Sequence, residues 1–264
     1  MKEMIEKTAV RICFMLSALL LAITACGPDP FFIPVKHIDG VPDTGVEGKI
    51  LPLNGKVTPD FATYKDISWI VTDNGNTVAV IKENRLVAVD SGLVSIRAVI
   101  ANGTAEGRDY TQDFIVTIRE IKVINNILEL EQYLSAQPAN TPGYPYFIKL
   151  ELDFNGVAST LNNYPDKYVG LDFSNTIQTI MENTFFNCKS IVEVTIPVNV
   201  KAIGALAFCN CYGLTSVTFE GFISFASFAD DAFPGDLRDK YMTGGIGTYI
   251  TNAPADDNSV WKKQ

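Results

Sequence analysis

Three cysteines in the second half of the chain are the residues best able to carry chemistry. Cys188 stands apart from the other two, and Cys209 lies two residues before Cys211. A disulfide within a Cys-x-Cys segment is geometrically strained, so bridging Cys209 to Cys211 is disfavoured. A metal site is also disfavoured, because the single histidine, His37, lies in the other half of the chain. Two interpretations of Cys188 and Cys211 stay open: buried free thiols, or a disulfide in an oxidising compartment.

Catalytic patterns find little support. His37 has no G-x-S-x-G nucleophile motif to accompany it. The acidic pairs, Asp230-Asp231 and Asp256-Asp257, are adjacent residues that are more typical of solvated loops than of a catalytic dyad. The glycine-rich segment 244–247 lacks the Lys-Ser/Thr of a phosphate loop, and segment 73–76 lacks the glutamate of a calcium loop. We expect no enzyme and no cofactor.

The N-terminus predicts export and lipidation. Basic residues precede an apolar run from Ile12 to Ala25, whose 14 residues would span roughly 21 Å as a helix, short of the ~30 Å bilayer core. Residues 1–25 are therefore predicted to be a removable signal peptide. The segment Leu21-Ala22-Ile23-Thr24-Ala25-Cys26 resembles the lipobox of bacterial lipoproteins, which implies lipidation of Cys26. The alternative is an ordinary secretory signal cleaved nearby.

The negative net charge of the chain argues against two classes of binding partner. The chain has a formal net charge of −9 and no basic cluster, which argues against nucleic acid as a partner. It also argues against a polybasic membrane patch, so we expect membrane attachment through acyl chains on Cys26. Residues 26–32 then form a short Pro-rich tether.

Residues 33–120 alternate with the period of β-strands. Short β-rich runs are separated by turn clusters, and Asn102-Gly103 is a strong hairpin signal. The pattern predicts a β-sandwich. The runs around Ile67-Ser68-Trp69 and Val94-Ser95-Ile96-Arg97-Ala98, with Gly92 between them, resemble a bacterial immunoglobulin-like (Big-type) domain. The resemblance implies that Trp69 is a buried anchor between two sheets, and that the domain spaces or carries binding modules.

A helix is predicted over residues 126–135, where Asn126 is a plausible N-cap and Ile127, Leu130 and Leu134 share one stripe. Beyond it the chain repeats itself with a period of about 23 residues. The matching pairs are Ile180 and Ile203, Phe185 and Phe208, Cys188 and Cys211, Ile191 and Leu214, Val194 and Val217, and Ile196 and Phe219. Phe233 continues the phenylalanine series at a slightly longer interval. Such a period predicts a short solenoid.

The repeat unit resembles the leucine-rich repeat of BspA-type bacterial surface antigens. It places the repeat domain at residues 121–247, with the helix as an N-terminal cap. A second helix over 234–242 and a hairpin within 248–264 would close the other end. The predicted fold is therefore mainly β, an immunoglobulin-like β-sandwich followed by a short capped leucine-rich-repeat solenoid.

The resemblance implies a lipid-anchored adhesin or host-interaction protein at the outer membrane or cell surface, with a protein or extracellular-matrix ligand. Strand alternation predicts an outward, polar contact surface on the repeats. Its expected members are Glu193, Thr195, Ser216, Thr218 and Glu220. Two alternatives stay open: a periplasm-facing structural or assembly lipoprotein that binds another envelope protein, and a carbohydrate-acting or glycan-binding protein, which the lack of paired carboxylates weakens.

Overall fold

The computed structural model describes residues 31–264, so the predicted signal peptide and Cys26 lie outside the described residues. The described chain is mostly β, with 36% of residues in strands and 12% in helices. It divides into two compact units between Ile118 and Arg119, two residues before the boundary that the sequence suggested. Among the described helices, none has the length and apolarity to cross a membrane.

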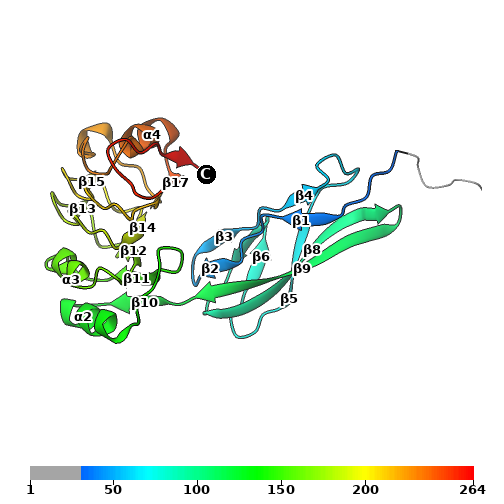
Figure 1. Ribbon diagram of the computed structural model, residues 1–264, viewed down its shortest axis with the longest axis horizontal. Helices are drawn as coiled ribbons and strands as arrows, with labels where there is room; N and C mark the ends of the chain where they lie inside the picture. Colours follow the sequence, from blue (N-terminus) through cyan, green and yellow to red (C-terminus); the bar gives the residue numbers. More distant parts are fainter. Residues whose placement is uncertain (1–30) are drawn as a thin grey trace, which may run out of the picture. The chain divides into compact units, whose positions relative to one another are not determined.

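The first unit consists of three β-sheets, and Figure 1 shows their strands in blue to green. The four-stranded sheet has the order β2 (Thr44–Val46), β9 (Arg108–Arg119), β8 (Gly92–Ala105) and β5 (Ser68–Asp73). The three-stranded sheet has the order β3 (Ile50–Pro52), β7 (Arg85–Val87) and β6 (Val80–Lys82), and β1 (His37–Asp39) pairs with β4 (Lys56–Thr58).

One apolar cluster unites these sheets. Alternate residues of β8 are buried, and Trp69 on β5 is only 7% exposed, as the sequence predicted. The Trp69 ring lies 5.8 Å from that of Phe114, and Trp69 pairs with Ala98 across the ladder. The core therefore forms without a disulfide among the described residues, because the described cysteines all lie in the second unit and are free.

The hairpin predicted at Asn102-Gly103 is wrong in its position. Strand β8 continues to Ala105, which pairs with Arg108, so the chain reverses at residues 106–107. Asn102 has a φ of 56° and its side-chain oxygen accepts a hydrogen bond from the Gly107 N–H at 2.7 Å. The left-handed conformation of Asn102 thus belongs to an irregularity within the β8–β9 ladder. Left-handed residues occur in such bulges as well as in hairpin turns.

The second unit is built on one seven-stranded sheet, whose first five strands are parallel and whose last two are antiparallel (Figure 1). Its order is β10 (Ile121–Ile124), β11 (Tyr146–Leu150), β12 (Val169–Phe173), β14 (Ile191–Ile196), β16 (Ser216–Phe219), β17 (Gly247–Ile250) and β18 (Lys262–Lys263). A second, two-stranded parallel sheet pairs β13 (Thr179–Ile180) with β15 (Ala202–Ile203).

The predicted period fixes the register of these strands. Val194 pairs with Val217 in the large sheet and Ile180 pairs with Ile203 in the small one, so residues one repeat apart lie side by side in both. Between the two sheets, Phe173, Phe185, Phe208 and Phe233 form a continuous stack with centroid distances of 5.4, 5.0 and 4.5 Å. Phe185, Phe208 and Phe233 are therefore core residues, as the repeat pattern predicted, and Phe173 of β12 extends their stack.

The two cysteines of the repeat lie in the same core. Cys188 and Cys211 are fully buried, and all three described cysteines are free thiols. The Cys211 thiol donates to the Phe185 carbonyl oxygen at 3.1 Å. Burial raises the pKa of Cys188 to about 12 and also raises the pKa of Cys211. Because the thiolate is the reactive form, these two side chains act as small apolar groups.

Helices cover the ends of the second unit. Helix α2 (Ile127–Ala136) begins where expected, and the Asn126 side chain accepts from the Glu129 N–H at 3.0 Å. The remaining helices are α3 (Val157–Asn163), the 3₁₀ turn η1 (Phe225–Ser227) and α4 (Leu237–Gly244). At the C-terminal end Trp261 is fully buried and its indole N–H donates to the Pro234 carbonyl at 2.9 Å.

One repeat position carries an unfavourable residue. Asn183 and Leu206 occupy equivalent positions, and both have a left-handed backbone, with φ of 58° and 57°. Asparagine tolerates this conformation, whereas a branched apolar side chain is strained by it. Leu206 is half-buried and does not belong to the core cluster, so little packing offsets that strain.

We expect Leu206→Asn to stabilise the second unit by about 1 kcal/mol, because asparagine relieves the left-handed strain. Thermal unfolding followed by circular dichroism should show a Tm raised by about 2–4 °C. The matched control is Asn183→Leu, which introduces the same strain one repeat earlier and should lower Tm. A lower Tm for Leu206→Asn would show that packing of the leucine outweighs its backbone strain.

Candidate binding face

The predicted contact residues lie on two strands that pair directly. Glu193 of β14 pairs with Ser216 of β16, and Thr195 pairs with Thr218. Between these two pairs, Val194 and its partner Val217 are fully buried on the opposite, core side of the sheet. The strand alternation therefore places the four polar residues on the outer face, in two rows that run across the strands.

The exposure of the five predicted residues varies. Glu193, Ser216 and Thr218 are half-buried, and Glu220, which follows β16, is exposed. Thr195 is only 7% exposed, so the expectation that it would offer a contact is wrong. Its register neighbours are Asp172 on one side and Thr218 on the other. Strands about 4.8 Å apart leave a short threonine side chain little access to solvent between these neighbours.

The rows extend beyond the predicted residues in both directions. Toward the C-terminus, the Thr218 hydroxyl lies 2.9 Å from the hydroxyl of Thr248 on β17. Toward the N-terminus, Lys149 pairs with Asp172 in the ladder, and Asp172 pairs with Thr195. One row thus carries a lysine, an aspartate and three threonines on five successive strands.

An ion pair lies at the N-terminal side of this row. The Lys149 ammonium lies 2.6 Å from a carboxylate oxygen of Glu151, and each side chain is about one-third exposed, at 33% and 30%. Two hydrogen bonds lower the pKa of the Glu151 carboxyl; the one from Lys149 has the larger effect and the one from Ser174 the smaller. The charges of this end are therefore already paired within the face.

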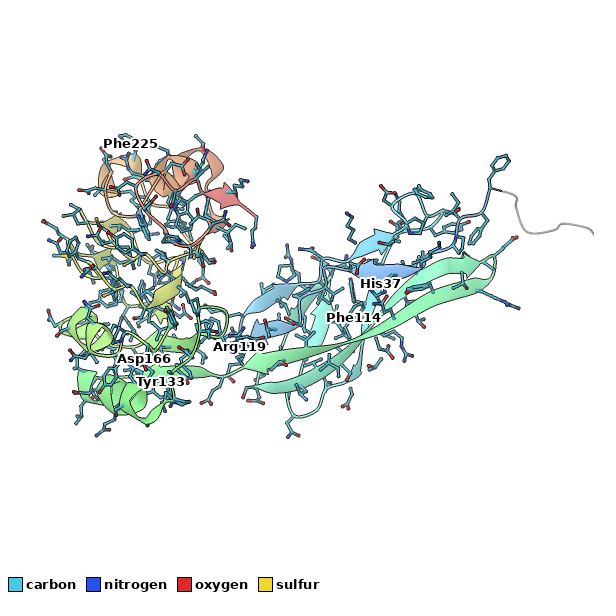
Figure 2. All side chains as sticks on the ribbon, viewed as in Figure 1. His37, Phe114, Arg119, Tyr133, Asp166 and Phe225 are labelled. Carbon is cyan, nitrogen blue, oxygen red and sulfur yellow. The ribbon has the colours of Figure 1, made fainter. Side chains whose placement is uncertain are left out.

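The other row ends in an aromatic and cationic corner. The Arg119 guanidinium lies 5.5 Å from the centre of the Tyr144 ring and 5.3 Å from that of Phe147. Phe147 pairs with Gly170, and a Cβ at Gly170 would lie only 2.7 Å from the Phe147 ring. The absence of a side chain at Gly170 is therefore what lets the ring lie across the neighbouring strand. Figure 2 labels Arg119 where β9 ends.

The sequence contained a signal for these additional residues. Lys149, Asp172, Thr195 and Thr218 follow one another at the repeat interval, as do Phe147, Gly170, Glu193 and Ser216. The outward positions of the two earlier strands follow the same register as the apolar positions that define the repeat. Thr248 had no such signal, because β17 is antiparallel to β16 and lies outside the period.

The other residues considered for chemistry are held by local contacts. His37 lies 2.9 Å from Asp39, and both side chains are more than half exposed, at 55% and 56%. Asp230 pairs with Arg238 at 2.7 Å, and Asp73 accepts a hydrogen bond from the Gly75 N–H at 2.9 Å, as in an ordinary turn. In residues 31–264 no group of three His, Cys, Asp or Glu side chains is placed to hold a metal ion.

Comparison with known proteins assigns part of the second unit. Residues 164–238 match the family model described as "BspA type Leucine rich repeat region (6 copies)". The match confirms the leucine-rich-repeat part of the resemblance. No curated protein matched the chain.

Five chains of known structure matched. One of them is a 2,6-sialyltransferase from Vibrionaceae Photobacterium sp. JT-ISH-224, in a ternary complex with CMP and lactose. The identity is 10% and the TM-score is 0.26, and the match covers 56% of this chain and 37% of that one. A likeness this weak supports no argument about fold or activity.

We expect Gly170→Ala to destabilise the second unit by about 1–3 kcal/mol, because the added methyl group would overlap the Phe147 ring and displace it. Chemical denaturation of the full chain measures the change. The control is Gly143→Ala, where a Cβ meets nothing within 4 Å, and which should stay within about 0.5 kcal/mol of the parent. Equal stability of the two variants would show that the ring is not held over Gly170.

Proposed function

We propose that this chain is a lipid-anchored binding protein of the cell envelope, exposed at the cell surface, where it acts as an adhesin or host-interaction protein. The observation that carries the proposal is the pair of polar rows on the outer face of the repeat sheet. Proteins with BspA-like repeats are often surface proteins that take part in adhesion. The ligand is a protein or a component of the extracellular matrix.

The second unit serves in this proposal as a short capped solenoid. Parallel strands at a constant offset and the continuous phenylalanine stack support this view, because each repeat contacts its neighbours and the stack makes one core. Such an array presents its strands as a broad surface. The residues that face outward on β11 to β17 then form a shallow platform suited to a macromolecule.

The first unit serves as a Big-type immunoglobulin-like spacer between the anchor and the platform. Support comes from its four-stranded and three-stranded sheets and from the buried Trp69. The Arg97–Asp113 ion pair lies on the outer side of the larger sheet, where N and O are 2.6 Å apart. A spacer of this kind holds the repeats away from the lipid. This role is inferred from architecture and not from a site.

Binding without catalysis fits the chemistry of the face. Hydroxyl and carboxylate groups dominate it, and its lysine is paired with Glu151 at 2.6 Å. We therefore propose no enzymatic activity and no cofactor. The alternative envelope role, a periplasm-facing assembly lipoprotein, would use the same face toward another envelope protein.

Surface exposure is tested by treating intact cells with protease. We expect the wild-type chain to be digested on unbroken cells. The Cys26→Ala variant should no longer fractionate with membranes, because it lacks the acylated residue. A periplasmic protein of the same cells, which must remain intact, is the control. Protection of the wild-type chain until the envelope is broken would favour the periplasm-facing alternative.

The role of the face is tested by reversing its charges. Glu193→Lys combined with Glu220→Lys should weaken or strengthen binding to immobilised extracellular-matrix proteins by about tenfold, which corresponds to about 1.4 kcal/mol. The control combines Glu131→Lys with Glu182→Lys, two exposed residues on α2 and beyond β13, and makes the same change in net charge. Identical binding by both double variants would argue against this face.

A further inference from the structure

Aromatic side chains gather where the described chain begins. Phe31 is 84% exposed, Phe61 is 66% exposed and Tyr64 is 46% exposed. The ring of Phe32 lies 6.3 Å from that of Tyr64, which links the first residues to the loop that follows β4. Single exposed aromatics are common on protein surfaces, whereas several together mark an interaction site.

Two hydrogen bonds between Ile33 and Thr63 hold this group in place. The Ile33 N–H donates to the Thr63 hydroxyl at 2.8 Å, and the Thr63 N–H donates to the Ile33 carbonyl at 2.9 Å. Ala62, between the two exposed loop aromatics, is only 4% exposed and belongs to the core. The loop is thus fixed to the first unit while its aromatic rings point to solvent. Figure 1 shows the chain entering this unit beside β1 and β4.

The position of the group relative to the predicted anchor limits what it can meet. Cys26 lies five residues before Phe31, and five residues span at most about 18 Å when fully extended. If Cys26 carries acyl chains, its backbone lies at the level of the lipid headgroups. Phe31 is then held within that distance of the membrane surface, and the ring of Tyr64 lies 6.3 Å from that of the next residue, Phe32.

We propose that Phe31, Phe32, Phe61 and Tyr64 form a second membrane contact that inserts into the headgroup region beside the lipidated Cys26. The inference rests on the proposed lipid anchor. Aromatic rings favour the membrane interface, where an apolar ring is buried and a tyrosine hydroxyl stays hydrated. The charged neighbour Lys65 permits this placement. Its ammonium donates to the Asp60 carbonyl oxygen at 2.9 Å, and a lysine can bury its stem beside apolar groups while its charged end stays in water.

The contact suits a zwitterionic lipid surface. The chain has a net charge of −9, and the loop itself carries Asp60 and Asp66 beside Lys65. An anionic membrane would repel this surface, whereas interfacial insertion of aromatic rings needs no net charge. The contact would orient the first unit on the bilayer, because it adds a second point of attachment to the acyl chains on Cys26.

The experiment uses the full-length lipidated protein reconstituted into phosphatidylcholine vesicles, with tryptophan introduced by Phe61→Trp or Tyr64→Trp. The matched control is Phe222→Trp in the second unit, since Phe222 is 68% exposed and resembles Phe61 in this respect. Subtracting the emission of the parent protein removes the signal of Trp69 and Trp261. Brominated phosphatidylcholine should reduce the emission of Trp at 61 or 64 by about twofold or more and leave that at 222 unchanged.

The outcomes separate this inference from the anchor. If the protein floats with the vesicles and the tryptophans at 61 and 64 are not quenched, the anchor stands and the aromatic contact is refuted. Equal quenching at 61 and 222 would also refute it, because the contact would not be local. If the protein purified from membranes neither carries acyl chains on Cys26 nor floats with vesicles, the anchor itself is wrong, and this contact is wrong with it.

Discussion

The second unit depends on stacking the phenylalanines of successive repeats on one another. A single repeat offers a strand, a turn and a phenylalanine, which cannot bury an apolar surface alone. Stacked in register, Phe173, Phe185, Phe208 and Phe233 each cover the next ring, with 4.5 Å between the last two centroids. The same register aligns backbone hydrogen bonds, such as that from the Phe185 N–H to the Ala207 carbonyl at 2.8 Å. Apolar burial and backbone pairing therefore require the same period.

A stack of this kind must end without leaving apolar faces or strand edges open. At the C-terminal end the parallel order gives way to antiparallel β17 and β18, and the last strand consists of two exposed lysines, Lys262 and Lys263. Charged residues on an edge strand oppose further pairing. Trp261, just before them, closes the core and satisfies its indole N–H on Pro234. At the other end α2 contributes Leu130 and Leu134 to the core.

The repeat made much of this unit predictable. Apolar positions at a fixed interval specified the register and the buried phenylalanines and cysteines, and local pattern specified the Asn126 cap. The hairpin at Asn102-Gly103 was misplaced because a left-handed asparagine serves equally in a turn and in a strand irregularity. The exposure predicted for Thr195 is wrong because strand alternation determines which face a side chain lies on. It does not determine how much of that side chain its neighbours on the adjacent strands bury. Phe147 of the aromatic and cationic corner follows the repeat interval, but Arg119 and Tyr144 do not, so their contacts with it could not be predicted.

The register also separates the residues that make the fold from those available for recognition. Val194 and Val217 must stay apolar because they face the phenylalanine core, whereas Glu193 and Ser216 on the same strands contribute little to it. Changes in the outer rows should therefore cost little stability, so they can be used to test the proposed binding. Gly170 is an exception, because the packing of Phe147 requires it. In a face built this way the fold depends on the inward side chains, so the outward side chains can differ while the backbone stays the same. A proposed binding surface needs this separation of fold and contact residues.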